Sequence, residues 1–371
     1  MGHAISVCIP AYNRPNELGD LLKSIAMQDF TDYEVVVCED NSPRRNEIRE
    51  VVSQFSGCYG TTIRYLENDQ TLGYDGNLRK LIREASGEYC LFMGNDDLLC
   101  PGALSLVAAA IKRYPNVGVV LRSYVSFDDT PAMINQAFVY FESERFFPAG
   151  GQTVAAFFRR CVVISGLTIH RESAAGHSTS KFDGTTLYQL HLVAQVLFEK
   201  NGVFLPQPIV YYRNTGVPEF GNSCSESGRF VPGQRTPESS LHFVRSMMAI
   251  ARHAEESSGV AVFKRIVADI GNYSYPLLSI QAGQPLGVFV RYCFRMAEVG
   301  LWKCPMFFLY VGALLLLGPM RVDSMIRQMK ARRRFTPLIG DVYAGEPMLV
   351  GLRRENEGRV GRTGLPGRDS G

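Results

Sequence analysis

Short apolar runs alternate with amphipathic segments along the first 125 residues. The apolar runs lie at 4–9, 33–38, 63–67, 88–93 and 117–122, and they are rich in the β-branched and aromatic residues that favour buried strands. Between them, apolar positions recur every three or four residues and predict helices, for example over 45–55, 75–85 and 103–113. Strands that alternate with helices of about ten residues predict an α/β fold with a mostly parallel sheet.

The rest of the chain is less regular and divides the sequence into four parts. A helix is predicted near 152–160, an amphipathic helix over 182–200, and a mobile loop over 214–239, where Pro, Gly and Ser are dense. Residues 237–280 are predicted to be helical, 286–335 are basic and very apolar, and the Gly/Arg-rich end is predicted to be disordered. The predicted parts are 1–125, 126–236, 237–340 and 341–371.

Polar clusters follow three of the predicted strands. They lie at 10–14, 39–42 and 95–97. Because parallel sheets bind ligands at the carboxyl ends of their strands, we expect the three clusters to share one site. Tyr12 can stack on a nucleobase, and a carboxylate such as Asp40 can accept a hydrogen bond from a base or a ribose. Loop turns and helix caps use the same residue types, so each cluster alone is weak evidence.

The third cluster, Asn95-Asp96-Asp97, carries the clearest chemistry. Two adjacent carboxylates at a strand end suit Mg²⁺ or Mn²⁺, which prefer oxygen ligands. Such a metal bridges the pyrophosphate of a nucleotide substrate and neutralises charge on the leaving group. The alternative is a plain Asx-rich cap before the helix at 103–113.

These segments together resemble the family-2 glycosyltransferases of the GT-A fold. The similarity rests on ISVCIPAYNR, on VVVCEDNS and on the stretch that ends in MGNDD. It is close over residues 4–125 and loose over 150–213, and the GNDD form is similar to that of abequosyl-type O-antigen transferases. The resemblance implies a GT-A-type sheet and transfer of a sugar from a nucleotide-diphosphate sugar by metal-assisted direct displacement. It also implies a role in surface polysaccharide biosynthesis.

The resemblance also assigns residues. It implies that Asp40 contacts the nucleobase, Asp96 the ribose or sugar, and Asp97 the metal. The other residues implied to line the nucleotide pocket are Pro10, Ala11, Tyr12, Arg14 and Asn77.

The sequence departs from the family pattern at two places. Asn95 stands at the usual third acidic position, and the helix that carries an acidic pair in many members reads GTTLYQ at 184–189. Because direct displacement needs a base to accept the proton of the attacking hydroxyl, Asp183 is the first candidate and His191 the second. A core histidine is the alternative interpretation of His191.

Three arginines follow the last predicted strand of this region. We expect Arg213, with Arg229 and Arg235 in the Pro/Gly/Ser-rich loop, to close over the diphosphate as a lid. Solvated loop arginines are the alternative.

Residues 304–320 form an uncharged run of seventeen residues, which is short for a membrane span and contains Pro and Gly. Trp302 and Lys303 precede it, and Arg321 opens a basic segment after it. This pattern predicts an in-plane or re-entrant anchor on the cytoplasmic face of the cell membrane, hence a peripheral or monotopic protein. Such an enzyme implies a lipid-linked acceptor, for example a polyprenyl-diphosphate glycan. A buried helix or an oligomer contact is the alternative.

Composition sharpens this picture. The 371 residues carry 39 Lys and Arg against 36 Asp and Glu, and a formal net charge of +3 argues against nucleic-acid binding. Residues 321–371 hold 11 Lys and Arg against 6 Asp and Glu, so residues 1–320 have a net charge of −2. The nine scattered cysteines favour a reducing cytoplasm.

Two other functions remain open from the sequence. Sugar nucleotidyltransferases share this fold class, but they usually carry a Gly-rich loop after the first strand, and PAYNRPNE has no Gly. A glycan- or nucleotide-binding protein without a catalytic base is the second alternative, since the acidic pair is missing.

Overall fold

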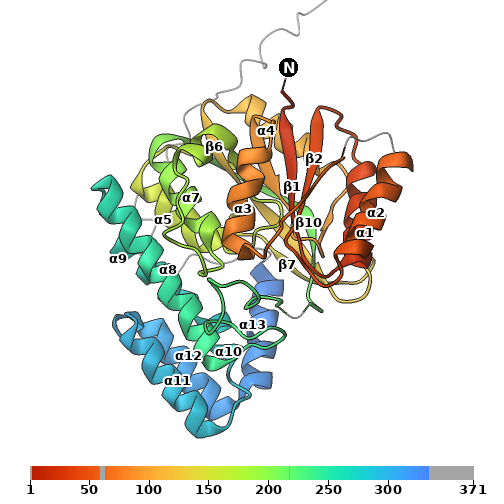
Figure 1. The fold of residues 1–371 in the computed structure, drawn as a ribbon. Helices are drawn as coiled ribbons and strands as arrows, with labels where there is room; N and C mark the ends of the chain where they lie inside the picture. Colours follow the sequence, from red (N-terminus) through yellow and green to blue (C-terminus); the bar gives the residue numbers. More distant parts are fainter. Residues whose placement is uncertain (1, 59–62, 217, 334–371) are drawn as a thin grey trace, which may run out of the picture.

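The computed structural model describes residues 2–58, 63–216 and 218–333 (Figure 1). Its described strands form one sheet with the order β3-β2-β1-β4-β9-β6-β10-β5, to which β7 adds at β6 and β8 at β10. The strands are β1 (Ile5–Ala11), β2 (Tyr33–Glu39), β3 (Ile63–Glu67), β4 (Tyr89–Phe92), β5 (Leu98–Leu99), β6 (Val117–Phe127), β7 (Ile134–Phe138), β8 (Arg145–Phe147), β9 (Thr168–His170) and β10 (Asn201–Arg213).

The predicted alternation of strands and helices is confirmed in the first 125 residues. β1 pairs in parallel with β2 and β4, β2 with β3, and β6 with β10. β9 lies antiparallel between β4 and β6 and joins the two parallel groups. The helices that flank the sheet are α1 (Pro15–Ala26), α2 (Arg45–Cys58), α3 (Gly73–Glu84), α4 (Ala103–Arg113), α5 (Gly151–Phe158), α6 (Arg171–Gly176) and α7 (Tyr188–Glu199).

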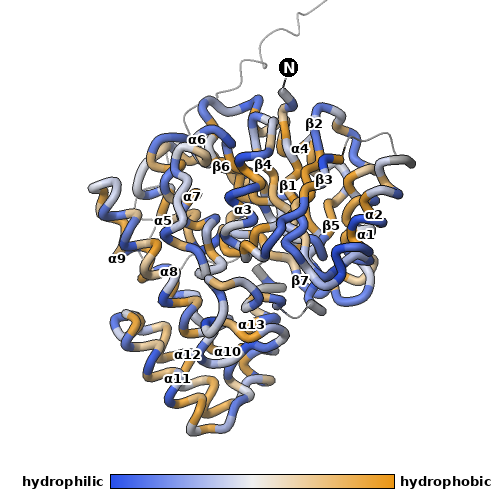
Figure 2. The backbone as a smooth tube through the Cα atoms, in the orientation of Figure 1, coloured by the Kyte–Doolittle hydropathy of each residue, from blue (hydrophilic) through white to orange (hydrophobic). Residues whose placement is uncertain are grey.

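Burial explains why these strands form. Every residue of β4 and β6 is buried, as expected for strands covered on two faces. Figure 2 shows the hydrophobic positions concentrated along the central strands, with hydrophilic positions on the outer helices. The apolar runs thus fix the sheet, and the polar clusters that end them fall at its carboxyl edge.

The helix predicted over 182–200 differs from the structure in start and character. α7 begins only at Tyr188, and its residues through Leu197 are all buried. The helix is therefore enclosed rather than amphipathic, because β6, α3, α5 and α8 (Pro237–Ser258) all pack against it. The segment before it, 183–187, is a turn that approaches the carboxyl edge of the sheet.

The C-terminal helices begin with α8 and α9 (Phe263–Asn272), which pack on α7 and α5, and continue below the sheet. They are α8, α9, α10 (Tyr275–Ser279), α11 (Leu286–Glu298), α12 (Pro305–Leu317) and α13 (Pro319–Arg333). Figure 1 shows α10–α13 below the sheet, on the side toward which β1 runs. We call α11–α13 the helical lobe. The predicted disordered segment 341–371 lies outside the described residues.

The uncharged run 304–320 does not form one continuous helix. α12 ends at Leu317, and Gly318, with φ of +78°, separates it from α13. Among the described residues, no helix combines the length and apolar character needed to cross a membrane.

Candidate functional site

A cavity of about 330 Å³ opens at the carboxyl ends of β1, β2 and β4. Its wall contains residues from each of the three polar clusters found in the sequence. The residues predicted for the nucleotide, the metal and the lid that line it are Pro10, Ala11, Tyr12, Arg14, Asp40, Asn77, Asp96, Asp97, Arg213 and Arg235. The structure thus brings these ten residues to one place, and their individual roles stay predictions.

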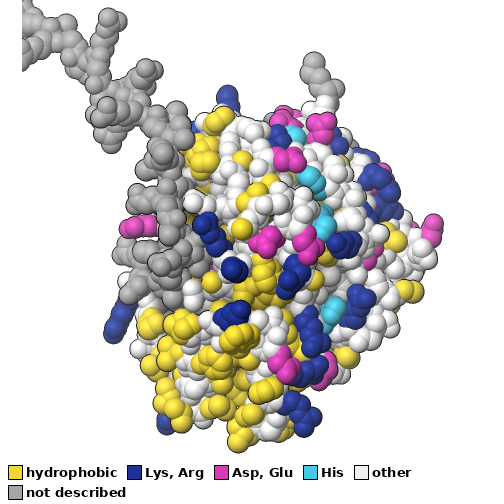
Figure 3. Space-filling view, turned by 90° about the vertical axis from the view of Figure 1, so that its left-hand side faces the viewer, with side chains coloured by type: hydrophobic (Ala, Val, Ile, Leu, Met, Phe, Trp, Pro, Cys, Tyr) yellow, Lys and Arg dark blue, Asp and Glu magenta, His cyan; other side chains and the backbone are white. Residues whose placement is uncertain are grey.

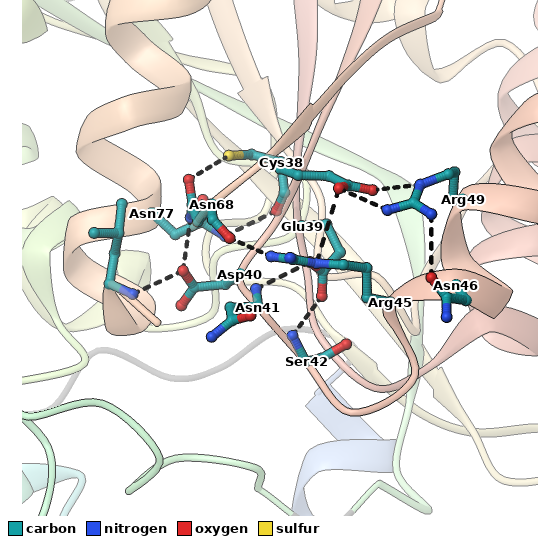
Figure 4. A network of polar contacts seen from close by, with 12 residues as sticks. Cys38, Glu39, Asp40, Asn41, Ser42, Arg45, Asn46, Arg49, Asn68 and Asn77 are labelled. Atoms are coloured by element: carbon teal, nitrogen blue, oxygen red, sulfur yellow. Dashed lines mark hydrogen bonds and ion pairs between the residues drawn. The ribbon is translucent and has the colours of Figure 1, made fainter. Parts of the chain in front are cut away.

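Asp40 ends β2 and is held by the first turn of α3 (Figure 4). Its Oδ1 accepts from Asn68 Nδ2 at 2.6 Å and Leu72 N at 2.8 Å, and its Oδ2 accepts from Gly73 N at 2.8 Å. Burial raises the pKa of this carboxyl, and the two backbone donors and Asn68 oppose the rise. A carboxylate offers about four acceptor positions. One position therefore remains for an N–H group of a ligand.

Asn77 and Tyr12 complete this end of the cavity. Asn77 Nδ2 donates to Cys38 O at 2.9 Å, which ties α3 to β2. Tyr12 lines the cavity with its ring, and burial raises the pKa of its hydroxyl, with the nearby charge of Glu219 adding to the rise. An aromatic ring beside a carboxylate with one open acceptor position can recognise a planar heterocycle that carries an N–H group.

Asp97 lies at the other end, almost completely buried. Its Oδ1 accepts from Arg213 N at 2.8 Å, and its Oδ2 accepts from the Ser165 hydroxyl, which in turn accepts from Gly94 N at 2.9 Å. Burial raises the pKa of Asp97 to about 6. The side chain is thus oriented by two donors before any ligand arrives.

Asp96 is more accessible and forms a close ion pair with Arg14. The backbone of Gly216 covers this pair, because a Cβ placed there would be 3.0 Å from Asp96 Oδ2. Asn95, at the family's third acidic position, donates from Nδ2 to Tyr12 O at 3.1 Å and joins the ends of β4 and β1. Asn95 therefore has a structural contact that explains an amide at this position.

The loop predicted over 214–239 contributes to the cavity wall with described residues between 216 and 235, and it is anchored at several points. Glu226 accepts from Tyr74 N at 2.8 Å and from Gly221 N at 2.9 Å, so it holds the loop on the start of α3. Arg229 donates to Asp183 O at 3.1 Å. Arg213 and Arg235 line the cavity, whereas Arg229 is not part of its wall.

Neither predicted catalytic base is part of the cavity wall. Asp183 accepts from Arg79 with both oxygens, at 2.6 and 2.8 Å. His191 is buried in α7, where its Nε2 lies 2.9 Å from His177 O and its ring packs against Phe182. The surroundings of His191 are those of a core histidine, and the proton acceptor of the reaction stays a prediction.

Burial of His191 predicts a pH-dependent stability. Desolvation lowers its pKa to about 4, so the folded chain keeps the ring neutral while the unfolded chain binds a proton near pH 6.5. The free energy of unfolding should therefore fall by about 3 kcal/mol as the pH drops from 7.5 to 4 through this residue alone. Urea unfolding of His191→Gln should show that much less pH dependence than the parent. His3→Gln, at an exposed histidine, is the control, and an unchanged slope in His191→Gln would contradict the neutral core histidine.

Asp75 organises the turn where the family's acidic pair would lie. Its carboxylate accepts from the backbone N–H groups of Thr185, Thr186 and Tyr188, each at 2.9 Å, and so caps the start of α7. Burial raises the pKa of Asp75 to about 6. Thr186, with φ of +59°, is part of the cavity wall.

Three functional candidates were not found from the sequence: Ser165, Glu226 and Asp75. Ser165 lies within a run that reads as an apolar strand, and only Thr168–His170 of that run is strand. Glu226 lies in a loop without periodicity. Ser165 is 68 residues from its partner Asp97 in the chain, and Glu226 is 152 residues from its partner Tyr74, so neither contact leaves a local pattern in the sequence.

A divalent metal fits the donors at Asp96 and Asp97 only with help from a ligand. No group of three or more His, Cys, Asp or Glu side chains in the described part of the chain is arranged to hold a metal ion. Mg²⁺ and similar ions commonly bind through one or two carboxylates and complete their shell with substrate phosphates and water. Two carboxylates at the cavity, one of them pre-oriented by Ser165 and Arg213, match that pattern.

Comparison with known proteins gives a family match over part of the chain. Residues 6–162 match the family described as Glycosyl transferase family 2. The abequosyltransferase RfbV of Salmonella typhimurium is 32% identical over 103 residues, which are 28% of this chain and 31% of that protein. A GalNAc(5)-diNAcBac-PP-undecaprenol beta-1,3-glucosyltransferase of Campylobacter jejuni is 35% identical over 114 residues, 30% of this chain and 36% of that protein. The chain thus spans about a third of the length of these curated relatives.

Solved structures share the fold. TarS of S. aureus in complex with UDP-GlcNAc aligns with a TM-score of 0.55 at 16% identity, over 80% of each chain. A mannosyltransferase of Pyrobaculum calidifontis in complex with GDP-Man and Mn²⁺ aligns with a TM-score of 0.50 at 15% identity, over 85% of this chain and 87% of the other. The predicted GT-A-type architecture is therefore confirmed.

Proposed function

We propose, from the glycosyl transferase family 2 domain that the chain carries over residues 6–162, that this protein transfers a sugar from a nucleotide-diphosphate sugar to a lipid-linked glycan. The observation that supports this proposal best is the cavity. One end of it carries Tyr12 and Asp40, which suit a nucleobase, and the other end carries the carboxylates of Asp96 and Asp97. The names of the relatives support a place in O-antigen or related polysaccharide biosynthesis, and one name contains an undecaprenol diphosphate acceptor.

The donor would lie along the carboxyl edge of the sheet. The open acceptor position of Asp40 receives an N–H group of the base while Tyr12 covers one face of the ring. Arg14 and Asp96 line the same cavity, so Arg14 would face the diphosphate while Asp96 receives the ribose or sugar hydroxyls. Arg213 and Arg235 lie on the loop side and favour the negative charge of the departing nucleotide.

Mg²⁺ or Mn²⁺, when bound, would be held by Asp97 and supply charge neutralisation at the diphosphate leaving group. The chain's contribution is orientation: Ser165 and Arg213 N fix the carboxylate of Asp97, and burial excludes water from it. Direct displacement then requires the acceptor hydroxyl opposite the leaving group, with its proton passed to a base. Asp183 is the first proposed base and must exchange its contacts with Arg79 to act.

Nucleotide release tests the proposal. The full chain is incubated with UDP-, GDP-, CDP- and dTDP-sugars, with and without Mn²⁺ and a bacterial lipid extract. We expect release of one nucleotide, stimulated by Mn²⁺ and by the extract. Absence of release from every donor would contradict glycosyl transfer, and incorporation of sugar 1-phosphate into a nucleotide sugar would instead show a nucleotidyltransferase.

The helical lobe supports a place at the cytoplasmic face of the cell membrane. Residues 286–333 hold eight Lys and Arg against two Asp and Glu. Figure 3 shows hydrophobic side chains gathered over the bottom of the molecule, where this lobe lies, with Lys and Arg at the margin. The most exposed apolar side chains of the lobe are Leu286, Phe294, Leu309, Leu316 and Met320. Such a surface suits in-plane contact with an anionic bilayer, and sedimentation with phosphatidylglycerol vesicles measures it.

A further inference from the structure

A groove runs between α11 and α12 in the helical lobe. It has a volume of about 660 Å³, and Trp302, from the short turn at Leu301–Lys303, is part of its wall. Its wall is apolar apart from Glu298, and its rim carries the aromatic rings of Phe294, Trp302 and Phe308. These three rings are 69%, 59% and 52% exposed, although aromatic side chains normally find cover in a soluble protein.

We propose that this groove binds the polyprenyl chain of the lipid-linked acceptor. The inference rests on the proposed glycosyl transfer and adds a binding site to it. A branched, unsaturated hydrocarbon chain offers only apolar contacts, which is what Val290, Phe294 and Phe308 present. The groove therefore suits the lipid part of the acceptor rather than its glycan.

Charge at the groove fits the phosphate that joins such a lipid to its glycan. Lys303 Nζ lies 4.9 Å from the centre of the Trp302 ring, which lines the groove. Arg291 is exposed on α11, three residues before Phe294 and hence on a neighbouring position of the same helix. These two cations beside the groove stand against one carboxylate in its wall, Glu298, and this balance favours an amphiphile with an anionic head over a neutral apolar partner.

The position of the groove also suits this occupant. α12, which forms one wall of the groove, also carries exposed apolar residues of the surface proposed to contact the bilayer, such as Leu309 and Leu316. The lobe lies on the side of the sheet at which β1 ends, which is also the side of the donor cavity (Figure 1). A lipid held there by its chain would keep its glycan on the side where transfer occurs.

Trp302 gives a direct measurement, because it is the only tryptophan of the chain and lies in the groove. Farnesyl phosphate, kept below its micelle concentration and without vesicles, should shift the Trp302 emission to shorter wavelength in a saturable manner. Inorganic phosphate should produce no shift. Phe294→Ser removes an exposed ring from the rim and should weaken farnesyl phosphate binding about tenfold.

The control is Leu316→Ser, which removes an exposed apolar side chain of the same lobe outside the groove. Both variants should sediment less with phosphatidylglycerol vesicles, but only Phe294→Ser should lose farnesyl phosphate binding. A shift that does not saturate, or equal binding by the two variants, would overturn the groove. Nucleotide release without farnesyl phosphate binding would contradict lipid binding in the groove but not glycosyl transfer. Farnesyl phosphate binding without nucleotide release from any donor would contradict glycosyl transfer but not lipid binding in the groove.

Discussion

Replacing Asp97 with Asn is expected to lower kcat/KM for nucleotide release about a thousandfold, or about 4 kcal/mol in transition-state stabilisation. Asn keeps the shape of the side chain: its oxygen can still accept from Arg213 N, and its amide nitrogen can donate to the Ser165 hydroxyl oxygen, so the fold should be retained. What it removes is one negative charge at a buried position beside the diphosphate. Mn²⁺ affinity, measured by electron paramagnetic resonance of the free ion, should fall in parallel.

The control for this substitution is Asp129→Asn, an exposed carboxylate outside the cavity wall, which should leave both quantities unchanged. Ser165→Ala should fall between the two, with about a tenfold loss of Mn²⁺ affinity, because it frees the orientation of Asp97 without removing its charge. If Asp97→Asn keeps Mn²⁺ affinity and turnover within about twofold, Asp97 is not the metal ligand.

The sequence predicts the donor half of the site because its residues lie where strands end. An apolar run that stops at a polar residue marks both the strand and the edge at which it stops. Parallel pairing then brings Tyr12, Asp40 and Asp97 to one cavity although they are far apart in the chain. The topology of an α/β sheet alone places these residues together, because ligands bind at the carboxyl ends of its strands.

The sequence is less informative about the acceptor half because its contacts are not periodic. The turn before α7 was expected to be the start of an amphipathic helix, and the carboxylate of Asp75, from α3, instead caps it. Gly184 lets the lid loop approach, since a Cβ there would be 2.0 Å from Ser225 O. Contacts between a loop, a turn and a distant helix leave no mark in a hydropathy pattern.

Asp75→Ala is expected to lower the stability of the fold strongly. Within the described part of the chain, Asp75 is the one acceptor that bonds the backbone N–H groups of Thr186 and Tyr188, and one of two acceptors for Thr185, all at buried residues. Each buried donor left without a partner costs about 1–3 kcal/mol, so the free energy of unfolding should fall by about 3–5 kcal/mol. Urea or thermal unfolding at pH 7.5 measures the loss.

Glu47→Ala provides the comparison, because it also removes a carboxylate from the first turn of a helix but at an exposed position, where little change is expected. Turnover gives a second readout. Because Thr186 lines the cavity, Asp75→Ala should also raise KM for the acceptor more than KM for the donor, whose predicted contacts, apart from Asn77 on α3, lie on or just after β1, β2 and β4. A variant as stable as the parent would show that water replaces the carboxylate at this turn, and equal rises in both KM values would separate the turn from acceptor binding.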